Sequence, residues 1–428
     1  MKKNETVFVG LSGGVDSAVS AALLKKQGYE VVGVFIRTWH PDFLECNEEE
    51  ERQDAMRVAA HLDIPFLTFD LADVYKKEVA DYMIAEYKAG RTPNPDVMCN
   101  KEVKFGAFLK KALSMGADYV ATGHYSQNKN LQHPLLVEEG AGGGNSKKHH
   151  HPAFGTPPPQ GGEKLNLVKG IDPSKDQSYF LWTLRQKQLK KTLFPIGYLK
   201  KFEVRKLAKK FNLPVAQKKD SQGICFLGAV DLKEFLKHYI KEKRGKVVLA
   251  SSGKRPDLES SKRSGLEELE VIGYHNGVVF HTLGERHGFT ITKKSPNDEA
   301  YYVVGKNMKK NILYVSQNKN FQHPLLVEEG VGGGNSKKHH PALKGTPPPQ
   351  GGEIINLKDT NWISKSYPLK AKSYSCQIRY HSEFLSCKIK CATSDVAQVI
   401  FKKPVLVASG QSCVIYDKNV CLGGGVVI

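Results

Sequence analysis

A glycine-rich turn near the N-terminus constrains the fold more than any other feature. Thr6–Leu11 is apolar and β-branched, as in a buried strand, and Val15–Lys26 carries apolar residues at helical spacing. Glycines at the junction permit a tight turn whose amides, with those of the helix N-terminus, can point at an anion. We therefore predict a strand, a phosphate-binding loop and a helix. The candidate nucleotide ligands are Gly10, Leu11, Ser12, Gly13, Gly14, Val15, Asp16 and Ser17.

Strands and helices continue to alternate after this turn. Such alternation predicts a parallel, doubly wound sheet and an α/β fold. The expected strands are Val31–Ile36, Phe66–Phe69 and Tyr119–Thr122. The expected helices are Ala55–His61, Val74–Lys88 and Phe105–Met115, with a further helical region over Asp176–Lys210.

The C-terminal part has a different pattern, with short strands separated by turns from about His281 onward. Regular short strands predict a small β-barrel. The expected barrel strands are Tyr301–Val304, Ile312–Val315, Ser375–Arg379, Cys387–Lys390, Gln398–Phe401 and Ser412–Tyr416. Together with a small mixed region before them, they predict three domains, at 1–205, 206–280 and 281–428.

Two segments of the chain are near-identical: Ser126–Leu167 recurs as Ser316–Leu357. A repeat usually marks a stacked structural unit, but two distant copies cannot form a solenoid. Gln127–Glu163 and Gln317–Glu353 together hold 10 of the 21 prolines and 14 of the 39 glycines, with little apolar sequence to bury. We therefore predict two disordered, non-catalytic inserts, one in the N-terminal and one in the C-terminal domain.

Charge and composition narrow the class of protein. The 63 basic and 44 acidic residues leave a net charge of +19, which suits a polyanionic partner. No apolar run approaches the ~20 residues of a membrane helix, so we expect no membrane contact and a cytoplasmic location. The eight cysteines show no CxxC spacing, and we expect no metal held by the protein itself.

The sequence of the glycine-rich turn is informative beyond its shape. Gly10–Ser17 is neither a Walker A loop, since no Gly-Lys-Ser/Thr follows, nor a GxGxxG fingerprint. Its Ser-Gly-Gly-Val-Asp-Ser core resembles the loop of the ATP-pyrophosphatase superfamily. That resemblance implies that the doubly wound sheet is of the adenine-nucleotide hydrolase type. It also implies cleavage of ATP between its α and β phosphates and adenylation of a substrate oxygen. Thiouridylases, lysidine synthases and argininosuccinate synthases share this loop, so it leaves the activity open.

Two further motifs each contain a cysteine. Gly90–Asn100 places two prolines and Cys99 in a loop that opens a helix, and Asp220–Phe226 carries Cys225 shortly after two lysines. A helix N-terminus or nearby cations raise the thiolate fraction of a cysteine. Each cysteine taken alone could equally be a small buried apolar residue.

Both motifs taken together resemble the bacterial and mitochondrial tRNA-specific 2-thiouridylase family (MnmA). The resemblance extends along nearly the whole chain outside the inserts. Further matching segments are Ala121–Tyr125, Gly170–Phe180, Gln377–Tyr380, Gly410–Ser412 and Cys421–Gly425. Glu285 and His287 depart from the family pattern, which has Gln and Lys there.

The resemblance implies ATP-dependent 2-thiolation of a wobble uridine in tRNA. It makes Cys225 the persulfide carrier and Cys99 its resolving partner through a disulfide, and it gives Asp96 an acid–base or base-orienting role. It also places the adenine near Ile36 and Gly123. The residues implied to contact tRNA or its target base are Asn94, Pro95, Asp96, His124, Lys175, Asp176, Gln177, Arg379, Tyr380 and Gln411.

The same resemblance implies the partners. ATP is a co-substrate that arrives with Mg²⁺, and the sulfur comes from a cysteine desulfurase, directly or through a relay protein. The expected tRNAs are those for glutamate, glutamine and lysine. A lysidine synthase, a non-catalytic tRNA-binding protein and a simple nucleotide-binding module are the alternatives; the first would need no cysteine pair and the last no barrel.

Overall fold

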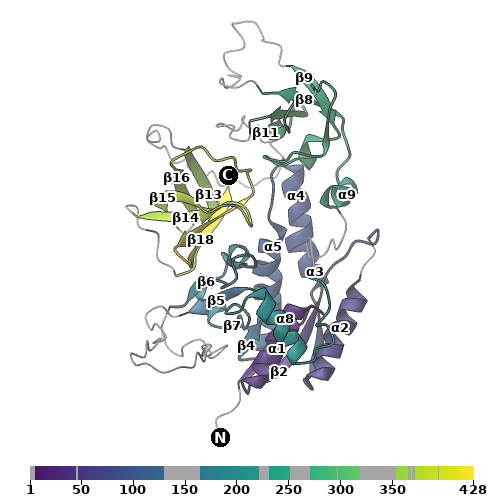
Figure 1. Ribbon diagram of the computed structural model, residues 1–428, viewed down its shortest axis with the longest axis vertical. Coiled ribbons are helices and arrows are strands. Elements are labelled where there is room, and N and C mark those ends of the chain that lie inside the picture. Colours follow the sequence, from purple (N-terminus) through teal and green to yellow (C-terminus); the bar gives the residue numbers. More distant parts are fainter. Residues whose placement is uncertain are drawn as a thin grey trace.

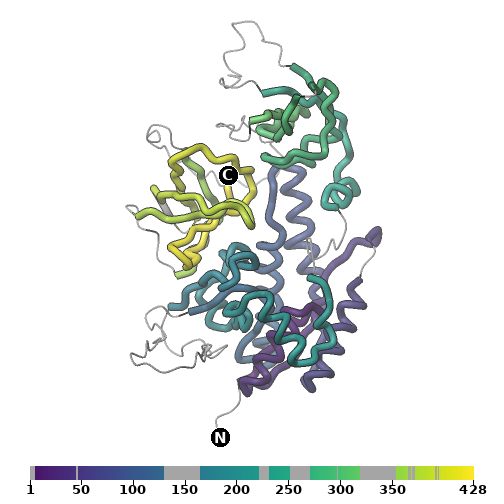
Figure 2. The backbone as a smooth tube through the Cα atoms, viewed as in Figure 1, coloured from purple at the N-terminus to yellow at the C-terminus, as the bar shows by residue number. Residues whose placement is uncertain are grey.

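A computed structural model gives the fold (Figures 1 and 2). It describes residues 5–44, 47–129, 164–220, 231–250, 270–295, 297–318, 353–364, 368, 372–393 and 395–428. The greater part of both predicted inserts, 130–163 and 319–352, lies outside the described residues, and so does Cys225. None of the helices within the described ranges is long and apolar enough to cross a bilayer.

The N-terminal region is built on a five-stranded parallel sheet, as predicted. Its strand order is β3-β2-β1-β4-β7. The strands are β1 (Thr6–Gly10), β2 (Glu30–Arg37), β3 (Phe66–Asp70), β4 (Tyr119–Ala121) and β7 (Thr192–Leu193). All four neighbouring pairs are parallel, and β1 lies between β2 and β4.

Helices cover both faces of this sheet, which confirms the doubly wound arrangement (Figure 1). Val7 and Val9 pack on one face with α1 (Val15–Lys26), α2 (Glu48–His61) and α8 (Lys201–Lys210). Phe8 packs on the other face with two longer helical stretches. The first runs through α3 (Ala72–Tyr75), a π segment (Lys76–Asp81) and α4 (Tyr82–Lys88), and the second through α5 (Pro95–Met98), a π segment (Cys99–Phe108) and α6 (Leu109–Ser114).

The expectation of a helical region over 176–210 is wrong for most of its length. Only α8 is a helix of more than one turn there, preceded by a 3₁₀ turn (Ser178–Leu181), α7 (Gln186–Leu189) and β7. Pro195 and Gly197 interrupt the helical pattern. A Cβ on Gly197 would lie 1.6 Å from the Ser126 carbonyl oxygen, so the chain passes too close to its neighbour there for a side chain.

A second, mixed sheet follows α9 (Leu232–Lys237) and has the order β10-β9-β8-β12-β11. Its strands are β8 (Gly245–Leu249), β9 (Val271–His275), β10 (Phe289–Ile291), β11 (Tyr302–Asn307) and β12 (Ile312–Ser316). The sequence pattern assigns the last two to the barrel, which is wrong: β12 pairs with β8 and β11 with β12. Short alternating strands look alike in either sheet, and only pairing separates them.

The C-terminal barrel is closed by six antiparallel strands. These are β13 (Glu353–Trp362), β14 (Ser373–Gln377), β15 (Leu385–Ala392), β16 (Val396–Phe401), β17 (Ser412–Asp417) and β18 (Val420–Val427). Pairing of β13 with β18 closes the ring. The hairpin of β5 (Ser126–Lys129) and β6 (Asn166–Lys169) extends it by pairing with β18.

That hairpin corrects the expected limits of the first insert. Gln127, expected to be disordered, is a buried residue of β5, and its side-chain amide donates a hydrogen bond of 2.7 Å to the Lys169 carbonyl. Glu353, at the end of the second expected insert, begins β13. The two ends of each repeat thus include residues of regular strands, because neighbouring strands supply the pairing that the local composition does not predict.

Candidate functional site

The glycine-rich turn joins β1 to α1 and has the predicted tight geometry. Gly13 has φ +69°, and a Cβ there would lie 2.4 Å from the Glu51 carbonyl oxygen. The Ser12 amide donates to the Ser17 hydroxyl at 3.2 Å, and that hydroxyl donates to the Gly14 carbonyl at 3.1 Å. The loop is therefore held from within, by residues of the motif itself.

This turn stands where an α/β sheet binds its ligands. The strand order changes direction at β1 and β4, and a ligand crevice forms at the carboxyl ends of strands at such a point. Gly123 follows β4, and a Cβ on it would lie 2.8 Å from the Ser17 amide nitrogen. Ile36, the other predicted adenine contact, is half-buried near the end of β2. The predicted nucleotide residues therefore converge on one edge of the sheet.

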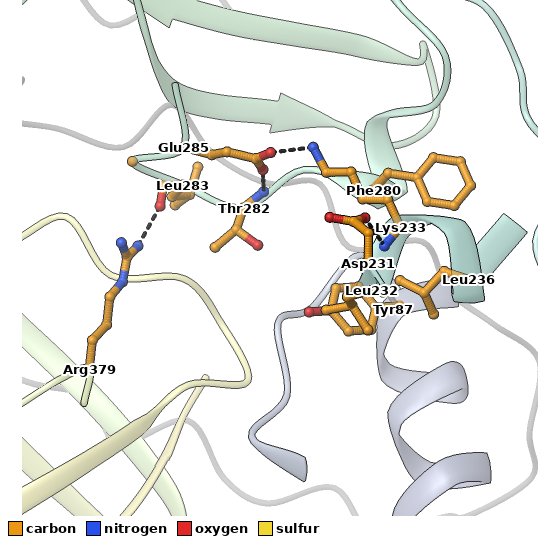
Figure 3. Close-up of a pocket in the computed structure, with 11 residues that line it drawn as sticks. Tyr87, Asp231, Leu232, Lys233, Leu236, Phe280, Thr282, Leu283, Glu285 and Arg379 are labelled. Atoms are coloured by element: carbon orange, nitrogen blue, oxygen red, sulfur yellow. Dashed lines mark hydrogen bonds and ion pairs between the residues drawn. The ribbon is translucent and has the colours of Figure 1, made fainter. Parts of the chain in front are cut away.

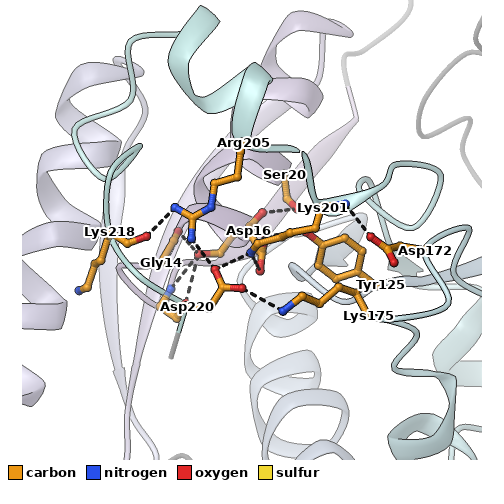
Figure 4. A network of polar contacts seen from close by, with 12 residues as sticks. Gly14, Asp16, Ser20, Tyr125, Asp172, Lys175, Lys201, Arg205, Lys218 and Asp220 are labelled. Carbon is orange, nitrogen blue, oxygen red and sulfur yellow. Dashed lines mark hydrogen bonds and ion pairs between the residues drawn. The ribbon is translucent and has the colours of Figure 1, made fainter. Parts of the chain in front are cut away.

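An ionic network surrounds Asp16, the acidic residue of the loop (Figure 4). Its carboxylate accepts hydrogen bonds from the Tyr125 hydroxyl at 2.8 Å and from the Lys201 ammonium at 2.8 and 2.9 Å. The same ammonium lies 2.8 Å from a carboxylate oxygen of Asp220. Lys201 thus joins the phosphate loop to the residue that precedes the segment carrying Cys225.

The Asp220 carboxylate contacts three cationic side chains. Lys175 donates to it at 3.0 Å, and Arg205 and Lys201 contact its other oxygen. Partial burial raises its pKa, but hydrogen bonds from Lys201 and Lys175 outweigh burial and hold the pKa well below its usual range. Motif reading missed Lys201 and Arg205, because a lysine-rich helix gives no local signal of this convergence. Tyr125 lies in a segment that matches the family, but the resemblance gives it no role there.

The second predicted loop opens the helical stretch that starts with α5. The Asn94 side chain caps it by accepting a hydrogen bond from the Val97 amide at 3.2 Å, and Pro95 occupies the first helical position. Asp96 lies in the first turn. Cys99 lies one turn further on, where the effect of the helix dipole has largely decayed. The dipole therefore favours negative charge at Asp96 more than at Cys99. Cys99 is buried, with 4% of the residue exposed.

The barrel holds this loop from the side. The Thr92 amide donates to the Ser409 carbonyl at 2.8 Å, and the Gln411 side chain donates to the Thr92 carbonyl at 3.1 Å. Gly410, with φ +91°, lets the two backbones meet, since a Cβ on it would lie 2.9 Å from the Thr92 carbonyl oxygen. Gln411, predicted to contact tRNA, therefore also positions the loop.

Aromatic side chains gather beside Asp96. The rings of Phe180 and Tyr380 have centroids 4.3 Å apart, and Tyr179 lies edge-on to Phe180. The Tyr179 hydroxyl donates to the Ser412 carbonyl at 3.1 Å. Burial, then the charges of Asp176 and Asp96, raise the pKa of Tyr380 to about 12. Three segments far apart in sequence thus meet at the second loop.

Residues 172–180 connect the two loops. Toward the phosphate loop, the Gln177 side-chain oxygen accepts from the Tyr125 amide at 3.0 Å. Toward the second loop, the Phe180 carbonyl accepts from the Asn100 side chain at 3.3 Å. Between them, Asp176 accepts from the Gly170 and Ser178 amides, so this carboxylate shapes the turn. The structure thereby brings most of the predicted residues into one connected region.

His124 and Arg379, both predicted to contact tRNA or its target base, are enclosed by other parts of the protein. His124 is buried, its Nδ1 lies 2.8 Å from the Thr122 hydroxyl, and burial holds its pKa well below the usual range. Arg379 is directed to the Leu283 carbonyl across the junction of barrel and central sheet. There it lines a cavity of about 380 Å³ (Figure 3), together with Thr282, Glu285 and Lys233.

Glu285, one of the departures from the family pattern, is held within this cavity wall. Its carboxylate contacts Lys233 and accepts from the Thr282 amide at 2.9 Å. His287, the other departure, is exposed and lies beside Arg286, with 3.1 Å between their nitrogens. The cavity itself does not include the phosphate loop.

The fold and these two loops define a class: an α/β nucleotide-binding protein with an appended mixed sheet and β-barrel. Three family models match in the same order along the chain. They are described as a tRNA methyl transferase HUP domain (residues 5–229), a tRNA methyl transferase PRC-barrel domain (233–317) and an aminomethyltransferase beta-barrel domain (353–427).

Whole-length relatives identify the family. The tRNA-specific 2-thiouridylase MnmA of Listeria monocytogenes is 37% identical over 98% of this chain and 94% of its own length. That of Nitrosomonas eutropha is 38% identical over 98% of both chains. The chain belongs to the tRNA-specific 2-thiouridylase (MnmA) family. A solved 4-thiouridine synthetase bound to RNA and ATP aligns at 16% identity over 55% of this chain and 50% of its own, with a TM-score of 0.30, from which nothing further follows.

Proposed function

We propose that this chain is a tRNA-uridine 2-sulfurtransferase that consumes ATP. The observation that carries the proposal is the pairing of a phosphate-type loop, at the switch point of the parallel sheet, with a second loop that bears Asp96 and Cys99. Family membership gives that pairing its substrate, since the relatives are named for 2-thiolation of tRNA. The net charge of +19 agrees with a polyanionic substrate.

In the first stage ATP is held by Gly10–Ser17, with its adenine near Ile36 and Gly123. The loop amides and the N-terminus of α1 compensate negative charge on the phosphates. The wobble uridine leaves its stack to reach the pocket beside Asn94 and Asp96. Its 2-oxygen attacks the α-phosphorus, and pyrophosphate leaves. Mg²⁺ would be bound mainly by phosphate oxygens, because the described residues contain no cluster of three or more metal-ligating side chains.

In the second stage the persulfide of Cys225 supplies sulfur. Its terminal sulfur attacks C2 of the adenylated uridine, and AMP leaves. The Cys99 thiolate then attacks the Cys225 sulfur, which releases 2-thiouridine and leaves a Cys99–Cys225 disulfide for cellular thiols to reduce. Since Cys99 is 4% exposed, this step requires its surroundings to rearrange when tRNA binds.

Several finer assignments belong to the same proposal. His124, Lys175, Asp176, Gln177, Arg379, Tyr380 and Gln411 serve the tRNA or its target base, directly or by shaping the loops that do. The tRNAs for glutamate, glutamine and lysine are the substrates, and a cysteine desulfurase or a relay protein loads Cys225. The domain limits also remain a proposal, although strand pairing favours ending the central domain after Ser316.

The test is a reconstituted reaction of protein, ATP, Mg²⁺, sulfide and unmodified tRNA, with mass analysis of the nucleosides. The proposal expects 2-thiouridine together with AMP and pyrophosphate. ADP and phosphate would contradict the role of the loop. Formation of lysidine when lysine replaces sulfide would favour the alternative synthase, and binding of tRNA without any product would favour a non-catalytic protein.

A further inference from the structure

One buried cation has no use in the reaction described above. Lys306, on β11 of the central sheet, is 2% exposed, and its ammonium donates to the Gly90 carbonyl at 2.9 Å and to the His281 carbonyl at 2.8 Å. Burying an ammonium costs free energy, and here burial lowers the pKa of Lys306 to about 8. Glu285 offsets part of that cost at longer range, while its carboxylate contacts Lys233, the Thr282 amide and the His281 ring.

One of the two carbonyls that Lys306 binds belongs to Gly90, the first residue of the loop that bears Asp96 and Cys99. Gly90 has φ +80°, and a Cβ on it would lie 2.7 Å from the Met308 sulfur, two residues from Lys306 on the same chain. Gly90 thus has the left-handed backbone conformation that favours glycine, and it packs directly against the central sheet. The entry of the loop is therefore fixed by the central sheet in addition to the backbone hydrogen bonds of Gly90 and Arg91 to α4.

The contact at Gly90 is one of several on this short entry. Arg91 is paired with Glu86 of α4, and the Thr92 hydroxyl lies 3.2 Å from that of Thr282. The barrel binds the Thr92 backbone through Ser409 and Gln411. Beyond this entry the chain is stiff, since two prolines and the Asn94 cap lead directly into α5. A displacement of Gly90 therefore carries over to Asp96 and Cys99.

We propose that Lys306 is a positioning residue for thiolation: by holding the Gly90 carbonyl it fixes where the Asp96–Cys99 loop meets the target uridine. The inference rests on the proposed function. Lys306 touches neither substrate nor reacting atoms, so its contribution is to the rate of the chemical steps and not to the binding of ATP. A mere structural tie between domains would instead lower stability and leave the folded fraction fully active.

Lys306→Met keeps the length and apolar stem of the side chain and removes its donors. Lys310→Met, at the exposed turn of the same hairpin, is the matched control. Thiolation by each purified protein is measured with saturating tRNA and sulfide, well below both melting temperatures. We expect kcat of Lys306→Met to fall about tenfold or more, with KM for ATP within about twofold and the folded circular dichroism spectrum retained. Unchanged kcat in the folded protein, or a loss equal to that of Lys310→Met, would overturn the inference.

A second variant keeps the test decisive if Lys306→Met does not fold. Lys306→Gln retains a neutral amide that can donate, and is expected to lose less kcat than a variant without any donor. Gln411→Leu removes the second clamp of the loop, and the Lys306→Gln, Gln411→Leu double variant completes a cycle. Non-additive losses in kcat are expected if both clamps position one loop, whereas strict additivity would contradict it. Failure of the proposed function is distinguishable, because the wild-type protein would then make no 2-thiouridine.

Discussion

The two loops of the site are built in opposite ways. The turn of the phosphate loop is held by hydrogen bonds among Ser12, Ser17 and Gly14. Its further contacts, from Asp16 to Tyr125 and Lys201, stay within the N-terminal domain. The Asp96–Cys99 loop is held by α4 of the N-terminal domain, by Lys306 of the central sheet, by Thr282, and by Gln411 of the barrel. The first loop thus depends on one domain, whereas the second requires three domains to assemble. This difference predicts which substitutions act locally and which act from a distance.

The largest expected effect is at the second loop itself. Cys99→Ser should lower persulfide-driven thiolation by at least about a thousandfold, because serine cannot attack the Cys225 sulfur to release 2-thiouridine. Cys387→Ala, in the barrel core, should retain activity. The rate of 2-thiouridine formation with a persulfide donor measures both. Activity of Cys99→Ser close to that of the wild type would contradict a role for Cys99 in sulfur transfer. The contacts that position this loop would then have no catalytic purpose at Cys99.

The ionisation of Lys306 gives the second largest effect, on stability. Its pKa is about 8 in the folded protein, against the 10.5 of an ordinary lysine, so between these pH values the unfolded state keeps a proton that the folded state has lost. Burial of the charged ammonium lowers the free energy of unfolding by its full amount below pH 8. As pH rises toward 10.5 the free energy of unfolding recovers by on the order of 3 kcal/mol.

Denaturant unfolding of wild type and Lys306→Met across this pH range measures that effect. The free energy of unfolding of the wild type should rise with pH relative to the variant. A difference that is constant with pH would show that Lys306 is not held in a desolvated position, and would weaken the contrast between the two loops.

Next in size is a change inside the phosphate loop. Gly13→Ala places a methyl group against the Glu51 carbonyl at a positive φ, and should lower kcat/KM for ATP about a hundredfold. Gly28→Ala is the control, since it also has positive φ but meets nothing within 4 Å. It should cost only about 1–2 kcal/mol of stability. Equal losses of activity in both variants would show that backbone strain, and not the loop, is responsible.

The smallest effect is expected from the repeats. Removing 130–163 and 319–352 and joining the flanks with short Gly/Ser links should leave the turnover number within a few-fold, because long additions between strand ends cost little. Turnover with saturating tRNA at two salt concentrations measures this. Loss of most activity would favour the rival hypothesis, in which the Lys/His tracts at Lys147–His151 and Lys337–His340 bind tRNA phosphates.

Sequence patterns predicted the first loop because strand, turn and helix are adjacent in the chain. The parallel sheet followed from the same local alternation. Three features could not be predicted in this way: the place of β11 and β12 in the central sheet, the pairing of β6 with β18, and β7. Each depends on hydrogen bonds between residues far apart in sequence, which leave no periodic signal.

The same reason separates the predicted from the missed site residues. Asp16, Asp96 and Cys99 lie in motifs and were identified there. Lys201 and Lys306 are single lysines among many, and only their bonds to Asp16 and to the Gly90 carbonyl distinguish them. The segment with Cys225 was identified by its motif and lies outside the described residues.

The central claim is that the phosphate loop directs adenylation of the uridine 2-oxygen before sulfur arrives. It is tested most directly with tRNA labelled with ¹⁸O at the 2-oxygen of the wobble uridine. After reaction with ATP and sulfide, the account predicts that the label leaves the tRNA and appears in the phosphate of AMP as 2-thiouridine forms. Unlabelled AMP alongside 2-thiouridine, or ADP as the nucleotide product, would contradict it.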